Sequence, residues 1–278
     1  MSTTAIFGAG VMGETLLSGL LRSGRPTEQI VITEKRPEHA ALLRDKYGVR
    51  VLDNVAAAAL ADSLGEGHYG AQLDVTDYAG FEKFVDEAEA ELGPLYAIVN
   101  NAGLTTVGAI AKSDPEAEMR MIEVDVVAVA DLCSRFLPGM VERGTGAVLN
   151  VASTAAFQPL PGQAGYAAGK AFVLSYTRSL HGELAGTGVT ATALCPGPVK
   201  TGFGEAAGIT EEDADKALPK FMWEDADSVA RCGLDGLAKG HPVAIPGLAN
   251  RLGANLAHLV PKRLLVPILS RQHPALRD

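Results

Sequence analysis

The chain has 278 residues, of which 47% are hydrophobic and 21% are charged, and this length suits one large α/β domain with a substantial buried core. Its formal net charge of −9, with no basic stripe to offset it, argues against nucleic acid as a partner. The three cysteines, Cys133, Cys195 and Cys232, form no CxxC pair, so we expect reduced, mostly buried thiols and no metal site.

The apolar stretch at the N-terminus predicts neither a signal peptide nor a membrane span. It is broken by Gly8, Gly10 and Gly13, has no basic leader, and meets Glu14 at once. Since no other segment has the length and apolarity of a transmembrane helix, we expect a cytoplasmic protein.

Apolar runs of strand length alternate with longer segments of helical period, which is typical of a parallel sheet covered by helices on both faces. The predicted strands are Ala5–Phe7, Gln29–Thr33, Val49–Leu52, Tyr69–Asp74, Tyr96–Asn100, Ala147–Val151, Val189–Cys195 and Val243–Ile245. The predicted helices are Val11–Arg22, Pro37–Lys46, Phe81–Leu92, Glu116–Glu142 and Ala164–Ala185. Without a repeat or a low-complexity linker, the whole chain, 1–278, is expected to be a single α/β domain: a Rossmann-type doubly wound parallel sheet in three αβα layers.

The last part of the chain, 246–278, differs from the rest and is expected to be a helical extension. Two apolar runs, 248–259 and 263–269, carry Arg, His and Lys and are interrupted by Pro261 and Pro267. We favour two short helices that pack over a substrate mouth or against another subunit. The alternative, a basic amphipathic tail on a membrane surface, is disfavoured because the apolar run is short and broken by proline.

A GxGxxG motif, Gly8-Ala9-Gly10-Val11-Met12-Gly13, directly follows the first predicted strand and opens the first predicted helix. In this context Gly8 permits a tight turn, Gly10 lets the backbone approach a pyrophosphate, and Gly13 lets helix and strand pack closely. The helix N-terminus offers unpaired N–H groups to phosphates. The motif therefore predicts a dinucleotide site that includes Val11 and Met12; the alternative is a purely structural glycine-rich turn.

Glu34, Lys35 and Arg36 follow the second predicted strand. An acid at this place binds the ribose 2′-OH of NAD, whereas basic groups favour the 2′-phosphate of NADP. Two cations against one anion favour NADP(H), and a solvated charged turn is the alternative.

Ser153, Tyr166 and Lys170 form a chemically coherent set. Ser153 follows a predicted strand, and Tyr166 and Lys170 lie at i and i+4 on one face of the next predicted helix. A tyrosine hydroxyl, with an unperturbed pKa of about 10, is a poor proton donor or acceptor at neutral pH. A nearby ammonium lowers that pKa towards the working range, and a serine hydroxyl can hold a substrate oxygen beside the tyrosine.

Together with three further motifs, this set resembles the short-chain dehydrogenase/reductase family over about residues 60–245. The motifs are Leu73-Asp74-Val75-Thr76, Asn100-Asn101-Ala102-Gly103, Ser153 with Tyr166-Ala167-Ala168-Gly169-Lys170, and Cys195-Pro196-Gly197-Pro198-Val199-Lys200-Thr201. Their order and spacing make the match highly specific.

The resemblance implies an oxidoreductase that interconverts carbonyl and alcohol by hydride transfer with NAD(P)(H). Tyr166 would be the general acid/base, Lys170 would lower its pKa and hold the nicotinamide ribose, and Ser153 would orient the substrate oxygen. The residues that would contact the cofactor are Asp74, Val75, Asn100, Ala102, Gly103, Pro196, Gly197, Val199 and Thr201. It also implies a homodimer or homotetramer assembled through the helices equivalent to 116–142 and 164–185.

Asp125 departs from this family, which usually carries Asn at that place in a catalytic tetrad that supports a proton relay. If the role belongs to the backbone carbonyl, Asp can serve. If it needs the side-chain amide, an ionised Asp lacks the donor. We expect activity to be retained but altered.

The glycine motif is the second departure, because short-chain dehydrogenases usually open with TGxxxGxG. Residues 1–58 instead resemble the cofactor unit of pyrroline-5-carboxylate reductase, with a junction near residues 56–61. Gly8 and Asp74 are 66 positions apart, which leaves room for an extra strand and helix over Val49–Leu64, so that Val49–Leu52 and Tyr69–Asp74 are rival third strands. The chain therefore has the make-up of a chimera: a glycine-loop βαβ unit over 1–58, a catalytic portion over 59–245 and the C-terminal extension.

Two alternative functions remain open. Pyrroline-5-carboxylate reduction rests on the first 58 residues only and needs a helical dimerisation domain that this chain replaces with short-chain dehydrogenase sequence. A catalytically silent NAD(P)-binding scaffold is the other, since the borrowed glycine loop can hold the pyrophosphate differently and catalysis is sensitive to displacements of about 1 Å.

The substrate is expected to be a small, apolar carbonyl or alcohol of moderate size. Apolar side chains in the loop 202–217 and after residue 246 would shape its pocket, and ordinary core packing is the alternative for each of them. They are Phe203, Ile209, Phe221, Met222, Trp223, Leu248 and Leu252.

Overall fold

The computed structural model describes residues 3–7, 30–33, 74–199, 219–257, 260–272 and 276. Within them lies a parallel sheet of six strands in the order β2-β1-β3-β4-β5-β6. The strands are β1 (Thr3–Phe7), β2 (Ile30–Thr33), β3 (Leu95–Asn100), β4 (Gly146–Val151), β5 (Val189–Leu194) and β6 (Val243–Ala244). Each was predicted from the sequence, with ends that differ by one or two residues. The rival third strands lie outside the described residues, apart from Asp74.

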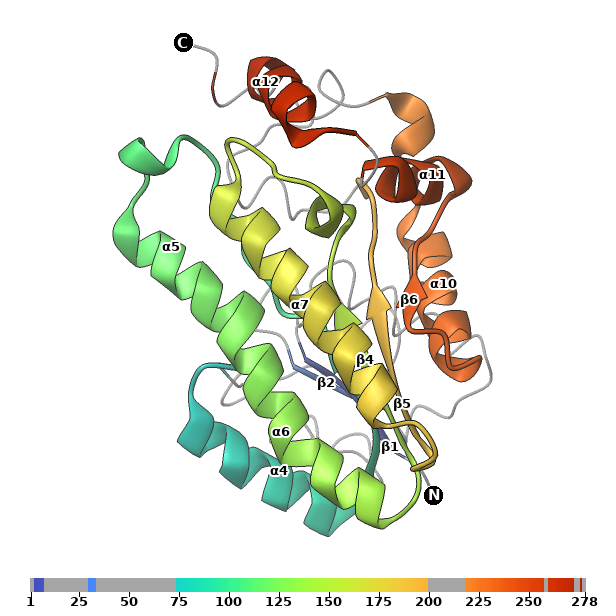
Figure 1. Cartoon of the computed structure of the whole chain (residues 1–278). Helices are drawn as coiled ribbons and strands as arrows, with labels where there is room; N and C mark the ends of the chain where they lie inside the picture. The colour runs from blue at the N-terminus through green and yellow to red at the C-terminus, as the bar shows by residue number, and fades with distance from the viewer. Residues whose placement is uncertain are drawn as a thin grey trace.

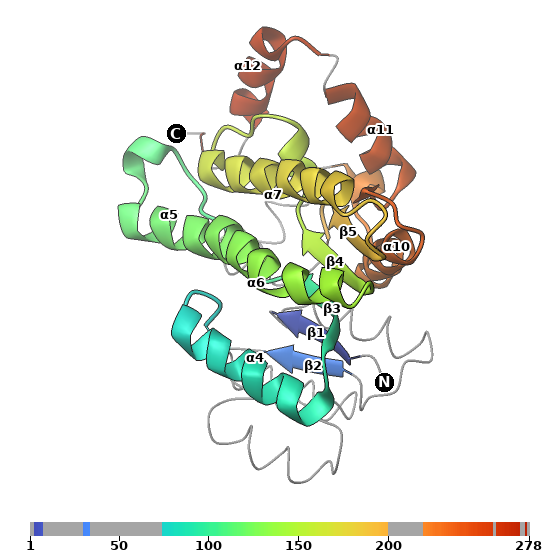
Figure 2. The ribbon, with the colours of Figure 1, turned by 60° about the horizontal axis from the view of Figure 1, so that its bottom comes forward.

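Helices cover both faces of this sheet (Figures 1 and 2). On one face lie α4 (Tyr78–Leu92), α6 (Ala128–Glu142) and α7 (Ala164–Glu183), and on the other lies α10 (Ala226–Ala238), which the sequence analysis missed. The arrangement confirms the three-layer Rossmann-type fold. The predicted helices 11–22 and 37–46 lie outside the described residues.

One predicted helix, 116–142, is divided into three parts. It comprises α5 (Pro115–Ile122), the π-helical turn η3 (Glu123–Val127) and α6. In η3 the N–H of Ala128 donates to the carbonyl of Glu123, five residues back. Single π turns inside α-helices occur frequently at functional sites, and this one carries Asp125.

The order of the strands reverses beside β1. The chain passes from β1 to β2 on one side and later returns to β3 on the other, so β1 pairs in parallel with both. Phe7 at the end of β1 lies opposite Asn100 at the end of β3. In open α/β sheets ligands bind outside the carboxyl ends of the strands at such a switch point. The glycine motif directly follows Phe7 in sequence, although its residues lie outside the described ones.

The hydrophobic core lies between the sheet and α6 and α7. Ile98 of β3 and Val148 of β4 are fully buried there, as are Cys133 of α6 and Val173 of α7. A rigid sheet covered in this way fixes the positions at which the loops leave the carboxyl ends of β3 and β4.

The C-terminal extension forms α11 (Leu248–Ala257) and α12 (Lys262–Gln272). Both helices lie beyond the end of α7 that carries its N-terminus, at one extremity of the molecule (Figure 1). Two short helices were predicted here.

Candidate active site

The predicted catalytic residues meet at the carboxyl ends of β3 and β4. Ser153 comes two residues after β4, where it caps the short 3₁₀ helix η4 (Thr154–Phe157). Tyr166 and Lys170 lie on successive turns at the start of α7, and Asp125 lies in η3. The four residues thus come from three segments that the sheet brings together.

The hydroxyl groups of Ser153 and Tyr166 are hydrogen-bonded to each other. Ser153 Oγ also accepts from the backbone N–H of Ala155 at 3.1 Å. Because the backbone bond fixes the serine rotamer, the serine hydroxyl is held next to the tyrosine oxygen.

Lys170 is buried behind Tyr166, with only 5% of its surface exposed. Its Nζ lies 5.7 Å from the centroid of the Tyr166 ring and donates to the carbonyl oxygen of Val151 at 3.2 Å. It also lies 3.0 Å from Oδ2 of Asp125. A buried ammonium is tolerated only when it is paired and hydrogen-bonded, and here the partner is a carboxylate.

Asp125 connects three segments of the site. Its exposed fraction is 1%, and while Oδ2 faces Lys170, Oδ1 accepts from the backbone N–H of Leu104 at 2.7 Å. A Cβ added to Gly103 would lie 3.2 Å from Lys170 Nζ and 3.5 Å from Asp125 Oδ1, so the Gly103 backbone lies directly beside this ion pair. The Asp125 side chain thus forms an ion pair with Lys170 through one oxygen and accepts from the Leu104 backbone through the other, a role that neither alternative considered from the sequence had included.

Burial raises the pKa of Tyr166, and the nearby Asp125 carboxylate raises it further. The Lys170 charge and the Ser153 hydrogen bond act to lower this pKa, but the net shift is upward. For Lys170, burial acts to lower the pKa, but the Asp125 carboxylate and Tyr166 together raise it. Residue types alone predict that Lys170 lowers the pKa of Tyr166. That expectation was wrong for the net shift, because it included neither burial nor the Lys170–Asp125 ion pair.

Asp125→Asn is expected to lower the pKa of Tyr166 and to move the pH dependence of turnover to lower pH. Asp125 raises the tyrosine pKa in the structure, so removing its charge leaves Lys170 to favour the phenolate more strongly. Alcohol oxidation, which needs the phenolate, should therefore set in at lower pH. The check is the pH profile of kcat together with a tyrosinate absorbance titration, with Asp125→Asn/Tyr166→Phe as the control. Complete loss of turnover, or an unchanged profile, would contradict this view.

Two predicted cofactor residues, Asp74 and Val75, have other partners in the structure. Asp74 pairs with Arg120 and accepts from the backbone N–H of Thr76 at 3.0 Å and from its hydroxyl at 2.8 Å. Burial acts to raise the pKa of Asp74, but the Thr76 and Arg120 contacts outweigh it and the pKa is lowered. Val75 is buried in the core. Arg120 was not singled out from the sequence, where it is only one basic residue on a helix.

Asn100 lies at the switch point and connects β3 to β4. Its Nδ2 donates to Oδ1 of Asn150 at 2.7 Å, and Asn150 donates to Oγ1 of Thr177 on α7 at 3.0 Å. Asn100 Oδ1 is buried and has no hydrogen-bond partner among the described residues. A buried acceptor left open at the switch point fits a donor of a bound dinucleotide. Nearby, Ala102 and Gly103 lie in the loop that leads from β3 to Asp125.

The segment after β5 carries the remaining described cofactor residues. The carbonyl of Pro196 accepts from the N–H of Thr154 at 2.8 Å, and Val199 forms a parallel bridge with Glu224. A Cβ on Gly197 would lie 2.4 Å from Oδ1 of Asn250. This buried side chain of α11 thus packs on the predicted nicotinamide loop, a contact that the sequence analysis missed.

Several predicted residues lie outside the described part of the chain. They are Gly8, Gly10, Val11, Met12, Gly13, Glu34, Lys35, Arg36, Thr201, Phe203 and Ile209. Of the other predicted substrate-shaping residues, Phe221, Leu248 and Leu252 are exposed, and Met222 and Trp223 are half-buried.

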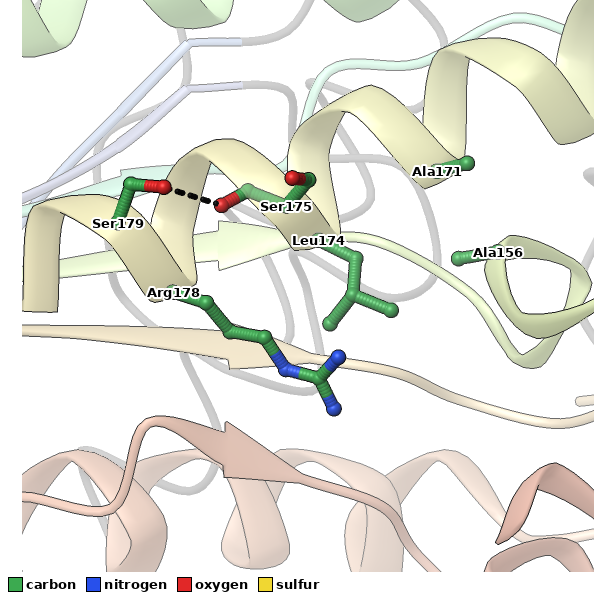
Figure 3. A pocket seen from close by; sticks show the side chains of 6 residues that line it. All are labelled: Ala156, Ala171, Leu174, Ser175, Arg178 and Ser179. Atoms are coloured by element: carbon green, nitrogen blue, oxygen red, sulfur yellow. Dashed lines mark hydrogen bonds between the residues drawn. The ribbon is translucent and has the colours of Figure 1, made fainter. Parts of the chain in front are cut away.

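A hollow on α7 is separate from this site (Figure 3). It is lined by Ala156, Ala171, Leu174, Ser175, Arg178 and Ser179. Ser179 donates to the carbonyl of Ser175 at 3.1 Å, and the Arg178 guanidinium carbon lies 5.7 Å from the centroid of the Phe157 ring. No residue of the Ser153, Tyr166, Lys170 and Asp125 group lines it.

No group of three or more His, Cys, Asp or Glu side chains able to hold a metal ion occurs within the described residues. The three cysteines are free thiols, and burial raises the pKa of Cys133 and of Cys195 to about 12. In the same part of the chain no helix is long and apolar enough to cross a membrane.

Comparison with known proteins identifies the family. A family model described as short chain dehydrogenase matches residues 40–212, more than half of the chain. The chain belongs to the short-chain dehydrogenase family. It is therefore an NAD(P)-dependent oxidoreductase that acts on small molecules, as its motifs predicted.

Relatives and solved structures agree with this family. Inactive 2-(S)-hydroxypropyl-CoM dehydrogenase 2 of Xanthobacter autotrophicus is 35% identical over 167 residues, 60% of this chain and 72% of that protein. Nodulation protein G of Azospirillum brasilense is 33% identical over 199 residues, 72% of this chain and 75% of that protein. The structure of a short-chain dehydrogenase from Sphingobium yanoikuyae in complex with NADPH has a TM-score of 0.72 at 26% identity and covers 100% of this chain and 99% of that one.

A second family model matches the N-terminal segment of this short-chain dehydrogenase. It is described as NADP oxidoreductase coenzyme F420-dependent, and it covers residues 3–64. The two matches overlap over residues 40–64, a range that includes the predicted junction. The N-terminal segment is thus similar to an NADP oxidoreductase family, and the catalytic portion belongs to the short-chain dehydrogenase family.

Proposed function

We propose that this protein interconverts a carbonyl and an alcohol by reversible hydride transfer with NAD(P)(H), with Tyr166 as general acid/base. The observation that carries the proposal is the placement of the Tyr166 hydroxyl against Ser153, with the buried ammonium of Lys170 behind its ring. Each group then has the chemical role that its residue type allows.

The residues fit a nicotinamide dinucleotide, which supplies or accepts the hydride when bound. The glycine motif with Gly8, Gly10 and Gly13 would hold the pyrophosphate. The other residues proposed to contact it are Val11, Met12, Glu34, Lys35, Arg36, Asp74, Val75, Asn100, Ala102, Gly103, Tyr166, Lys170, Pro196, Gly197, Val199 and Thr201. The open acceptor of Asn100 at the switch point supports this placement.

In the reductive direction, Ser153 donates a hydrogen bond to the substrate carbonyl oxygen and holds it beside Tyr166. Tyr166 then donates its proton to that oxygen as negative charge develops there. Lys170 stabilises the phenolate that remains, and Asp125 holds Lys170 in place through the ion pair at 3.0 Å. In the oxidative direction the same groups act in reverse, and the phenolate takes up the proton of the alcohol.

The proposed substrate is an apolar carbonyl or alcohol of moderate size. The half-buried apolar side chains of Met222 and Trp223, just before the Val199–Glu224 bridge, support this class. The direct test is NAD(P)H oxidation across a panel of aliphatic and aromatic ketones, and cofactor reduction with the matching alcohols. Turnover of apolar members that is lost in Tyr166→Phe supports the proposal, whereas turnover only of polar hydroxy acids contradicts the substrate class.

NADP(H) is expected to be preferred over NAD(H). Lys35 and Arg36 outnumber Glu34 after β2, and the N-terminal segment matches an NADP oxidoreductase model. The check is the ratio of kcat/KM for NADPH to that for NADH, which should exceed one and fall in Lys35→Gln/Arg36→Gln. A clear preference of the unaltered enzyme for NADH would refute the expectation.

Two structural proposals accompany this function. The first is that 1–278 form a single domain, since β1 and β2 share one sheet with the later strands. The second is a homodimer or homotetramer assembled through α5, α6 and α7. Phe172 on α7, 37% exposed and stacked on Tyr176 at 5.4 Å between ring centroids, supports this face.

A silent NAD(P)-binding scaffold is the second candidate function, favoured by one observation. Asp125 pairs with Lys170 and so opposes the charge that would stabilise a Tyr166 phenolate. Nucleotide binding without turnover of any ketone or alcohol in the panel, at any pH, would support this candidate over the enzyme.

A further inference from the structure

Helix α11 has the reverse of the usual amphipathic arrangement. Its buried residues are Asn250, Ala254 and Ala257, two alanines and an amide. Its large side chains form a stripe at i, i+4 and i+8 that faces outward: Leu248 is 70% exposed, Leu252 53% and Leu256 55%. A helix of a globular domain normally turns such leucines to the core, so this stripe is available for a contact outside the domain.

Further exposed apolar side chains follow α11 in sequence. Val260 in the connection and Leu264 and Ile268 on α12, again at i and i+4, are 38%, 57% and 52% exposed. On the other side, Phe221 of η5 (Lys220–Met222) is 71% exposed, and η5 is joined to α11 by the bond from Asn250 Nδ2 to the carbonyl of Met222 at 3.0 Å. We call these seven apolar side chains the C-terminal apolar surface. They are more than half of the large exposed apolar side chains in the described residues, a concentration that marks an interaction site.

The charge of the C-terminal extension is opposite to that of the rest of the chain. Residues 246–278 hold five Lys or Arg and a single acid, Asp278, whereas the whole chain has a net charge of −9. Exposed basic residues, Lys220, Arg251 and Arg263, lie next to the apolar side chains in sequence. Apolar side chains flanked by cations, with no acid between residues 247 and 272, match an anionic lipid surface.

The form of the two helices suits a contact in the plane of a membrane. They have 10 and 11 residues, about half of what a span needs, and they lie together at one extremity of the molecule (Figures 1 and 2). From the sequence alone, a membrane role is disfavoured because the apolar run is short and is broken by Pro261 and Pro267. In the structure Pro261 lies between the two helices and Pro267 lies within α12, and a contact in the plane of a membrane needs no long, continuous apolar helix.

We propose that the C-terminal apolar surface binds the surface of a membrane that contains anionic lipids. The apolar side chains enter the boundary between headgroups and acyl chains, and the cations lie at the level of the lipid phosphates. A second copy of the chain is a poorer occupant, because a two-fold contact through this surface would bring like charges together.

The test is co-sedimentation of the full-length protein with vesicles. Mixed vesicles, made of equal parts of phosphatidylcholine and phosphatidylserine, should bind the protein. Vesicles of phosphatidylcholine alone should bind it at least about tenfold more weakly, because each cation near an anionic surface strengthens binding by about fivefold. Leu256→Gln/Leu264→Gln/Ile268→Gln should weaken binding to mixed vesicles by at least about tenfold per side chain, the order expected for burying a large apolar group. Arg251→Gln/Arg263→Gln should weaken it on mixed vesicles only.

The matched control is Ile110→Gln, at a position 62% exposed on η2 (Ile110–Lys112), outside α11, α12 and the helices proposed for assembly, which should bind like the unaltered protein. Thermal unfolding checks that all variants fold. The proposal would be overturned if the unaltered protein did not bind mixed vesicles, or if Leu256→Gln/Leu264→Gln/Ile268→Gln bound them as well as the control variant. It would also be overturned if the protein bound no vesicles but sedimented as a dimer that the Leu256, Leu264 and Ile268 substitutions abolished. The surface would then be a contact with a second copy of the chain.

Discussion

Replacing Tyr166 with Phe is expected to lower kcat by about 100- to 10,000-fold, the usual contribution of a general acid–base group. The substitution removes only the hydroxyl that is hydrogen-bonded to Ser153, while the ring, 5.7 Å from Lys170 Nζ, keeps its place. Nucleotide affinity and thermal stability should therefore stay close to those of the unaltered enzyme. The measurement is single-turnover and steady-state kinetics with the best substrate of the panel, together with fluorescence titration of NADPH.

Ser153→Ala is the matched comparison for this prediction. It removes the other hydroxyl of the pair and should also reduce kcat, but with the proton donor still present the pH dependence of the remaining activity should still report Tyr166. If Tyr166→Phe retained more than a tenth of the activity, the proton would have to come from another group, and the proposed role of Tyr166 would be wrong.

Lys170→Met is expected to destabilise the protein by about 3–5 kcal/mol, because breaking a buried ion pair leaves one charge without compensation. Asp125, 1% exposed, would keep only the bond from Leu104 N–H at 2.7 Å. Activity should fall as well, since the group that favours the phenolate is gone. The free energy of unfolding is measured in urea, and kcat is measured at a temperature at which the variant is folded.

The double variant Lys170→Met/Asp125→Asn separates the structural role of Lys170 from its catalytic role. With a neutral amide at position 125 no unpaired charge is buried, so most of the lost stability should return while activity stays low. A double variant no more stable than Lys170→Met would show that the ion pair does not account for the loss. Recovery of activity together with stability would show that Lys170 acts on the fold alone.

The strands and the general fold were predictable because their signals are local. Each of the six described strands is a short apolar run between polar segments, and the i, i+4 spacing of Tyr166 and Lys170 is sufficient to place them on one helix face. The break in helix 116–142 was not predictable, since the residues of η3 have the same helical period as their neighbours. Helix α10 was missed because residues 226–238 contain two glycines and few large apolar side chains.

The contacts that define the site depend on tertiary structure. Asp125 and Lys170, or Asp74 and Arg120, are about 45 positions apart, and no periodicity links them; only the packing of η3 against α7 and of α5 beside Asp74 brings each pair together. The same holds for Asn250, which the sequence places within an apolar run and the fold places on Gly197. The direction of the Tyr166 pKa shift could not be predicted from residue types, because it depends on burial and on the Lys170–Asp125 pair.

β1 pairs with β3 through the backbone, so the pairing places few demands on the sequence of β1. Thr4, Ala5, Ile6 and Phe7 align with Ala97, Ile98, Val99 and Asn100, and parallel strands are joined by backbone hydrogen bonds that any sequence with the right dihedral angles can make. A foreign βαβ unit therefore needs only a strand of matching length and apolar character to take its place beside β3. Recombination can in this way exchange the nucleotide-binding unit as an interchangeable part, and leave the proton-transfer residues on β4 and α7 unchanged.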